Sequence, residues 1–255
     1  MEHANFTVFL VFVFFLSAIL FQIRRIRDGK KVFLRRIPGL EVIDEVIGQS
    51  TEQDRPIMFN PGFEGLGVEL FCSLAVMGHV VRRAAKLSMP VLSPLADPLA
   101  YAMAEEYWKD GYAAEGKEGL FPVEDSLRYL SGNQSAYAAG VAGWIKRERV
   151  GANLIFGMYG YESLVIAEAG QQAGAVQIAC TPSFFQVPFF IVSCDYTVFG
   201  EEFYAAGAYF SRDPVLTGSL IAQDWLKLLV LSLIILGSLS LTLGNNAWLS
   251  ALMFW

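Results

Sequence analysis

"NLIFGMYGYESLVIAEAGQQAGAVQIAC", residues 153–180, decides the fold class of this chain. Its two ends are short apolar runs, and a longer segment typical of a helix lies between them. We predict strands at 153–158 and 175–180 and a helix at 161–174. A strand, a helix and a second strand form a right-handed crossover between parallel neighbours. The stretch therefore predicts an α/β fold.

The same alternation continues on both sides of this stretch, over residues 37–225. It predicts one α/β domain with a mainly parallel sheet and helices on both faces. Gly48 is expected to end the first helix of the domain, and Asn133 to cap a later one. We predict further strands at residues 57–60, within 90–98, at 126–131 and at 188–194, and further helices at 37–47, 68–87, 99–110, 133–148, 200–211 and 213–227.

Two apolar runs flank this domain. The chain of 255 residues is 54% hydrophobic, which is too apolar for an ordinary soluble domain. Residues 6–23 and 228–243 carry no charge, and each run is long enough to cross a bilayer. Trp225 and Trp248 suit interfacial anchors on either side of the second run. We expect an N-terminal anchor at 1–23, a second transmembrane helix at 226–243 and an apolar outer tail at 244–255; the alternative is two buried core helices.

Charge predicts the orientation. Residues 24–36, "RRIRDGKKVFLRR", form a juxtamembrane collar with seven basic side chains and one acid. The positive-inside rule places this collar in the cytoplasm, with both termini outside. Residues 37–225 hold 11 basic and 23 acidic side chains, a net charge of 11 − 23 = −12. An acidic body of this kind is repelled by nucleic acid, so nucleic-acid binding is not expected.

The turn "NPGFEGLGVEL", residues 60–70, resembles a phosphate-binding loop only superficially. Its glycines, Gly62, Gly65 and Gly67, lack the G-x-G-x-x-G order, and no lysine followed by Ser or Thr opens the helix. Glu64 and Glu69 occupy the positions at which a phosphate would bind. We therefore expect these glycines to serve a sharp turn, and no nucleotide or other cofactor is predicted.

Ligands of open α/β sheets bind beyond the carboxyl ends of the strands. No histidine or basic residue is expected at these ends, so no catalytic residue and no metal site is predicted. The three carboxylates among the polar residues there could do acid–base chemistry, or they could simply cap helices and order loops. The ligand-binding candidates are Asn60, Asp97, Asn133, Tyr161, Glu162 and Asp195.

Several helices of the domain have faces of small residues. The sequence "YAAG" occurs at 137–140 and again at 204–207. Such faces either pack closely on their own sheet or meet a second subunit. The candidates for an oligomer interface are Gly140, Gly143, Gly170 and Gly207. Three cysteines without CxxC spacing indicate free, mostly buried thiols, and His79 is expected to be a packed or surface residue of its helix.

Four stretches carry a resemblance to a known family: "LAVMGHV" (74–80), "YAAGVAG" (137–143), "YGYESLVIAEAGQQAGAVQIACT" (159–181) and the run from 189 to 224. They resemble an uncharacterised prokaryotic family of membrane-anchored proteins with a cytoplasmic α/β domain of unknown function, over about residues 33–227. The resemblance implies the same plan in a cytoplasmic membrane and supplies no activity.

Taken together, these features favour a non-catalytic membrane-tethered scaffold or interaction module. Its expected partners are the lipid bilayer and either further copies of itself or other subunits of a membrane complex. The alternative is a small-molecule sensor or enzyme that uses the crevice at the strand ends. A transporter or channel is disfavoured, because neither apolar run carries a central ionisable residue.

Overall fold

The computed structural model describes residues 6–29, 35–63, 65–118, 123–211 and 213–242. These residues fall into two compact units, residues 34–211 and residues 1–33 with 212–255. Trp248, the tail at 244–255, Glu64 and part of the basic collar lie outside the described residues.

The first unit contains one sheet of parallel strands in the order β3-β2-β1-β4-β5-β6. The predicted α/β fold with a parallel sheet is thus confirmed. In the register, Ile57 of β1 faces Ala152 of β4, and Ala152 faces Val176 of β5. The strands are β1 (Ile57–Asn60), β2 (Val91–Leu95), β3 (Leu127–Tyr129), β4 (Ala152–Phe156), β5 (Val176–Thr181) and β6 (Tyr196–Phe199).

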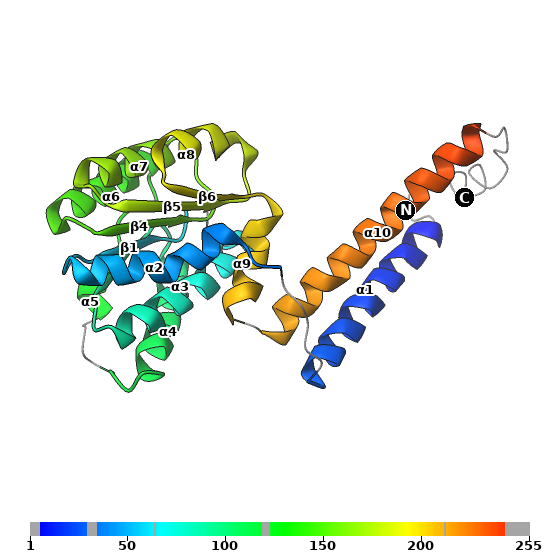
Figure 1. Cartoon of the computed structure of the whole chain (residues 1–255), viewed down its shortest axis with the longest axis horizontal. Coiled ribbons are helices and arrows are strands. Elements are labelled where there is room, and N and C mark those ends of the chain that lie inside the picture. The colour runs from blue at the N-terminus through cyan, green and yellow to red at the C-terminus, as the bar shows by residue number, and fades with distance from the viewer. Residues whose placement is uncertain (1–5, 30–34, 64, 119–122, 212, 243–255) are drawn as a thin grey trace. The chain divides into compact units, whose positions relative to one another are not determined.

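Helices cover both faces of the sheet, and each face has its own buried apolar cluster. One face carries α2 (Pro38–Glu52), α3 (Val68–Lys86), α4 (Pro98–Ala113) and α9 (Glu201–Ser211). The other carries α6 (Gln134–Glu148), α7 (Glu162–Ala173) and α8 (Val187–Ser193). Figure 1 shows the two layers above and below the strands. The short helices α5 (Val123–Ser126) and η1 (Phe184–Gln186) lie in connections.

Arg55, directly before β1, joins the ends of α6 and α7. Its Nη2 donates to the carbonyl oxygens of Val150 and Ala173 over 2.7 and 2.6 Å. Its Nε donates to the Arg149 carbonyl oxygen over 2.7 Å. A positive guanidinium complements the negative ends of both helices. Arg149 and Gly174, which end the two helices, have left-handed backbone conformations.

Two predictions about element boundaries are wrong. Residues 188–194 are not a strand: residues 188–193 lie in α8, where Pro188 suits the first turn, and Cys194 follows the end of the helix. The sixth strand is Tyr196–Phe199 instead. Gly48 does not end α2, which continues to Glu52. Added side-chain atoms at Gly48 would meet nothing within 4 Å, so this glycine sits on an open side of the helix.

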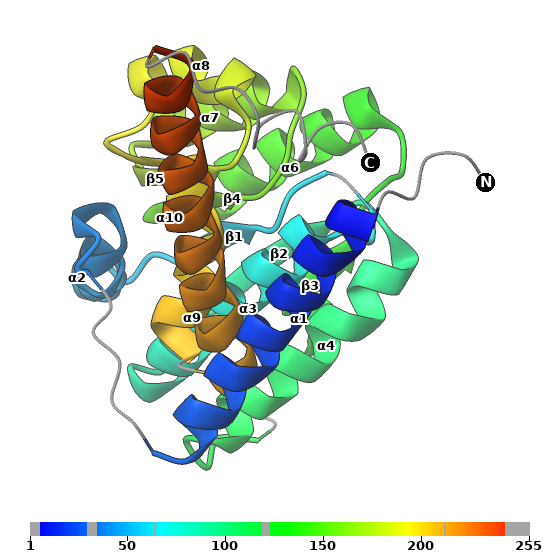
Figure 2. The same cartoon turned by 90° about the vertical axis from the view of Figure 1, so that its right-hand side faces the viewer.

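The second unit is an antiparallel pair of long helices, α1 (Phe6–Arg27) and α10 (Pro214–Thr242). Both are long and apolar enough to cross a membrane. They are in contact with each other, and Figure 2 shows them diverging away from the ends at which they meet. They run side by side in Figure 1, and Gly218 allows a close approach. A Cβ on Gly218 would lie 2.9 Å from Ile23 Cα. Trp225 is partly exposed on α10, which runs through it without interruption.

Candidate functional site

The carboxyl ends of β1 and β4 mark the centre of the edge at which ligands bind in open parallel sheets. These two strands are neighbours, although the helices that follow them, α3 and α7, cover opposite faces. The order β3-β2-β1-β4-β5-β6 is that of doubly wound nucleotide-binding domains, whose crevice opens at this reversal. The loops after β1 and β4 therefore form the candidate site.

In this protein the two loops close on each other. Gly62 and Gly157 have left-handed backbone conformations, with φ of +109° and +132°. A Cβ on Gly157 would lie 2.5 Å from the Pro61 carbonyl oxygen. The Phe63 amide donates to the Met158 carbonyl oxygen over 3.0 Å. Protein backbone thus occupies the point at which a dinucleotide crevice would open.

The start of α3 already holds a carboxylate. Gly67 is the N-cap residue and offers no side chain, while Glu69 lies in the first turn of the helix. The Glu69 carboxylate accepts a hydrogen bond from the Tyr204 hydroxyl of α9 over 2.8 Å. A phosphate at this helix terminus would meet that negative charge, so the loop geometry opposes an anion here.

A polar cluster forms where α6 and α7 begin. The Glu162 side chain is fully buried, and its carboxylate accepts a hydrogen bond from the Gly160 amide over 2.6 Å. The Gln134 side-chain amide donates to the same carboxylate. The hydroxyl groups of Ser135 and Tyr161 lie 2.6 Å apart beside it. Two predicted ligand residues, Tyr161 and Glu162, therefore lie together and bind the two helix starts to each other.

Asp97 and Asn133 cap helices. Asp97 Oδ1 accepts from the backbone amides of Leu99 and Ala100, over 2.6 and 3.2 Å, at the start of α4. Asn133 Oδ1 accepts from the Ala136 amide over 3.1 Å at the start of α6. These contacts satisfy orphan amides of the first helical turn. Of the two roles considered for the carboxylates, acid–base chemistry and helix capping, Asp97 has the capping role.

Asn60 belongs to a buried row of side-chain amides that crosses three strands. Asn60 Nδ2 donates to Asn153 Oδ1, and Asn153 Nδ2 donates to Gln177 Oε1, each over 2.8 Å. Gln177 Nε2 donates to the Ala167 carbonyl oxygen over 2.9 Å. Gly170 lies over the row, because a Cβ there would be 2.2 Å from Gln177 Oε1. The sequence signal that we missed is the presence of amide residues inside otherwise apolar strands.

Asp195 lies at the amino-terminal ends of the strands, opposite the carboxyl edge that holds the candidate site. It precedes β6, and its Oδ2 accepts a hydrogen bond from the Gln177 amide at the start of β5, over 2.7 Å. We expected Asp195 to follow a strand at 188–194, and that strand is a helix. The structure therefore does not bring Asp195 together with Asp97 and Glu162.

The four glycines proposed for an oligomer interface differ in their surroundings. Gly170 and Gly207 are buried within the α/β unit, and Gly207 packs α9 against α3. A Cβ on Gly140 would lie 3.1 Å from Leu130 Cδ1 of the same unit. Gly143 is exposed, and a Cβ on it would meet no atom of the other described residues within 4 Å beyond its own helix backbone. Internal packing accounts for the small size of Gly170 and Gly140, whereas a Cβ on Gly207 would meet its neighbours only at 3.6 Å or more.

The phenols beneath the candidate site stay protonated. Burial raises the pKa of Tyr137 and Tyr159 well above the usual range, and the nearby Glu162 carboxylate raises both further. The Tyr159 hydroxyl donates to the Asn60 carbonyl oxygen over 2.7 Å. These groups can donate hydrogen bonds near neutral pH but cannot act as bases there.

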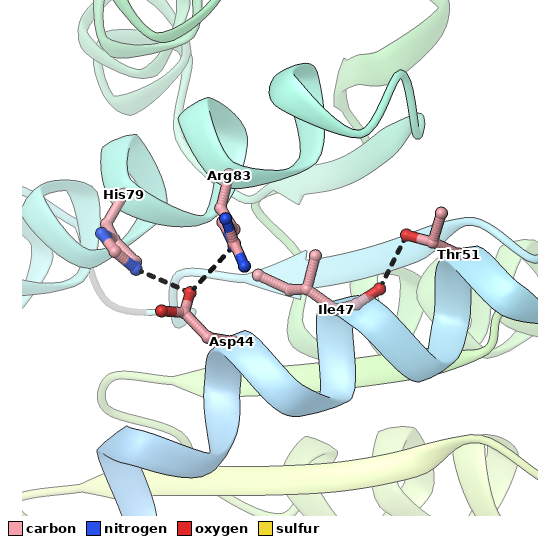
Figure 3. A network of polar contacts seen from close by, with 5 residues as sticks. All are labelled: Asp44, Ile47, Thr51, His79 and Arg83. Atoms are coloured by element: carbon pink, nitrogen blue, oxygen red, sulfur yellow. Dashed lines mark hydrogen bonds and ion pairs between the residues drawn. The ribbon is translucent and has the colours of Figure 1, made fainter.

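His79 forms a separate network on the other face of the sheet (Figure 3). Asp44 Oδ1 of α2 lies 3.1 Å from His79 Nε2 and 3.6 Å from Arg83 Nε, both on α3. Burial lowers the pKa of His79, and Asp44 opposes that shift. The ring stacks on Phe210 at 4.2 Å. Among the described residues, no group of three or more His, Cys, Asp or Glu could hold a metal ion.

Comparison with family models matches residues 1–252 to a domain of unknown function, DUF6754. Neither the curated proteins nor the solved structures include a match to the chain. The matched range contains the α/β unit and both long apolar helices, and it confirms the resemblance to an uncharacterised family. The chain belongs to the DUF6754 family.

Proposed function

We propose that this protein is a non-catalytic, membrane-tethered module that self-associates within the cytoplasmic membrane of a prokaryote or joins a larger membrane complex. Its α/β domain lies on the cytoplasmic side. The seven basic residues at 24–36 support this orientation, because they would adjoin anionic headgroups. The apolar helices α1 and α10 support a tether at both ends of the domain.

An exposed apolar rim at the carboxyl edge carries this proposal. The α3–α4 rim consists of Leu66, Val68, Phe71 and Leu99, which are all classed as exposed. A Cβ on Gly65 would lie 3.6 Å from Asp97 Oδ2, so the segments after β1 and β2 lie side by side. Asp97 is engaged in the cap of α4 and Glu69 in the hydrogen bond from Tyr204, whereas a ligand site would direct several polar groups outward. Contiguous exposed apolar side chains favour a protein contact.

A second copy of the chain is the occupant that we propose for the rim. Two copies anchored in one membrane share a plane, which raises the frequency of their encounters. The test is native mass spectrometry of the full chain released gently from membranes. We expect one defined oligomer without added ligand mass, and smaller species for Val68→Asp with Leu99→Asp. Leu164→Asp, at an exposed position of α7 outside the rim, is the matched control and should leave the oligomer intact.

The alternative is a ligand sensor or enzyme, and the buried Glu162 favours it. Among the residues that the structure describes, none forms a salt bridge with this carboxylate, and it lies at the edge where doubly wound domains bind ligands, so it is a reasonable anchor for a polar molecule. In this case the native mass spectrum would show a monomer with a stoichiometric small molecule. Glu162→Gln would remove that added mass. Such a result would replace the self-association proposal.

A further inference from the structure

The segment around α8 leaves an apolar face exposed. No charged residue lies between Glu168 and Asp195, a run of 26 residues. Within this run, η1 and α8 hold one side of the segment in the domain and turn the other side outward. The α8 face is the set of exposed side chains Phe184, Phe185, Phe189, Ile191 and Val192. Phe185 and Val192 are 91% and 83% exposed, which is far more than packing within the domain would leave.

The α8 face is held firmly from beneath. Phe190 is fully buried, and its ring meets the Tyr159 ring edge-on at 6.3 Å. The Thr181 hydroxyl donates to Gln186 Oε1 over 2.6 Å. At the other end, Gln177 Nε2 donates to the Ser193 carbonyl oxygen over 2.7 Å. The segment that carries the exposed phenylalanines is therefore fixed to the domain by packing at Phe190 and by hydrogen bonds near both of its ends.

The length and composition of this face suit a lipid surface. A phenylalanine offers about 150–250 Å², so the five side chains expose on the order of 600 Å² in all. The ten residues of η1 and α8 span about 15 Å, which is too short to cross a bilayer. A short helix with phenylalanines on its outer side fits into the interfacial plane of a membrane.

The charge pattern favours the same occupant. Residues 37–225 carry a net charge of −12, so most of the domain surface is repelled by anionic lipid. The run that contains the α8 face adds no acidic side chain to that repulsion. Phenylalanine, isoleucine and valine side chains can enter the headgroup region without a charge to desolvate.

The chain also keeps this face near a bilayer. Only two residues separate the end of α9 at Ser211 from the start of α10 at Pro214. Residues 28–37, between α1 and α2, extend to at most about 35 Å. A domain of this size has a radius of gyration of about 16 Å, so its surface stays within a few tens of ångströms of the bilayer. The tether raises the local concentration of lipid, so even a small apolar face suffices.

We propose that the α8 face is an in-plane membrane anchor that holds the α/β domain against the bilayer into which α1 and α10 insert. The inference needs those two helices to span a membrane, and it does not depend on self-association. Its ligand is the acyl and headgroup boundary of the bilayer rather than one particular lipid.

The test uses fluorescent labels on the full chain in phosphatidylcholine–phosphatidylglycerol vesicles. Single cysteines replace Phe185 and Val192 in a Cys194→Ser background, because Cys72 and Cys180 are buried. A label at Ile234→Cys, on the exposed side of α10, is the control for a lipid environment. A label at Lys146→Cys, on α6, is the control for an aqueous environment. We expect nitroxide lipids to quench the labels at 185 and 192 severalfold more than the label at 146, and comparably to the label at 234.

Two results would overturn the proposal. One is that labels at 185 and 192 are as open to aqueous iodide as the label at 146, while the label at 234 remains quenched by lipid. The other is contact between labels at 185 on two copies without lipid quenching, which would assign the face to a second copy. Repeating the measurement with Val68→Asp and Leu99→Asp separates membrane docking from self-association, since docking should persist in that variant.

Discussion

Gly62 and Gly157 lie against each other where β1 and β4 end, and a Cβ on Gly157 would be 3.0 Å from Gly62 Cα. Such close contact of two main chains leaves no room for a Cβ at Gly157 and very little at Gly62. The contact closes the reversal point of a sheet whose order is otherwise that of nucleotide-binding domains. It is the main structural reason for proposing a contact surface rather than a nucleotide site.

Gly157→Ala should destabilise the α/β domain. The residue has φ of +132°, and the added methyl group would overlap the Pro61 carbonyl oxygen. We expect a loss of about 2 kcal/mol or more in the free energy of unfolding, measured by thermal unfolding of the detergent-solubilised chain. Gly143→Ala, on an open helical surface, is the control and should stabilise by about 0.5–1 kcal/mol. Equal effects of the two changes would contradict the proposed loop contact.

Gly170→Ala should lower the free energy of unfolding, whereas Gly207→Ala should not, although both glycines are buried. A Cβ on Gly170 would overlap Gln177 Oε1 and disrupt the amide row, which we expect to cost about 2–3 kcal/mol. A Cβ on Gly207 would meet its neighbours at 3.6 Å or more, which is ordinary contact. Chemical denaturation of the two variants checks this. A loss of oligomer without a loss of stability at Gly170 would instead indicate an intersubunit role.

The thiols should react slowly in the folded protein. Burial raises the pKa of Cys72 and Cys194 to about 11, with smaller contributions from Glu69 and Asp195 respectively. The thiolate that attacks a disulfide reagent is therefore scarce near neutral pH. The stabilisation linked to these thiols is complete below their unfolded pKa and is lost as pH rises through about 11. Titration with a chromogenic disulfide should show all three thiols reacting rapidly only after unfolding; rapid native reaction of Cys72 would refute this.

Acid should weaken the domain through His79. Its folded pKa lies below the ordinary value of 6.5, so the unfolded chain binds the proton more tightly. Stability should fall as pH drops below 6.5 and level off below the folded pKa. His79→Gln should remove this part of the pH dependence of the melting temperature. Asp44→Asn, which removes the carboxylate that raises the pKa, should widen the pH range of the loss.

The sequence predicted the sheet well where apolar runs were short and followed by turn residues, as at 57–60 and 153–158. It failed at 188–194, because a short, mostly apolar run without a charged residue is compatible with a buried strand and with a short helix. Only Phe190 of that run faces the core deeply, and its exposed neighbours cannot be recognised without the tertiary structure. Pro188 was the available signal for the start of a helix.

The candidate site was partly predictable. The residues after strands with secure boundaries, Asp97, Asn133, Tyr161 and Glu162, do lie at the carboxyl edge. Asp195 does not, because its position depended on the misassigned strand. The hydrogen-bond partners of Glu162 come from residues 134 and 160, and a pairing between separate helices leaves no local trace in the sequence.

Arg55 also has a consequence for the order in which the chain folds. Its guanidinium precedes the first strand, yet its acceptors lie 94, 95 and 118 residues further along. The ends of α6 and α7 can be joined only after loops of that length have closed, which makes their joining a late, non-local step. During synthesis, the Arg55 guanidinium therefore remains hydrated and cannot form all of these hydrogen bonds until the segment through Ala173 has left the ribosome.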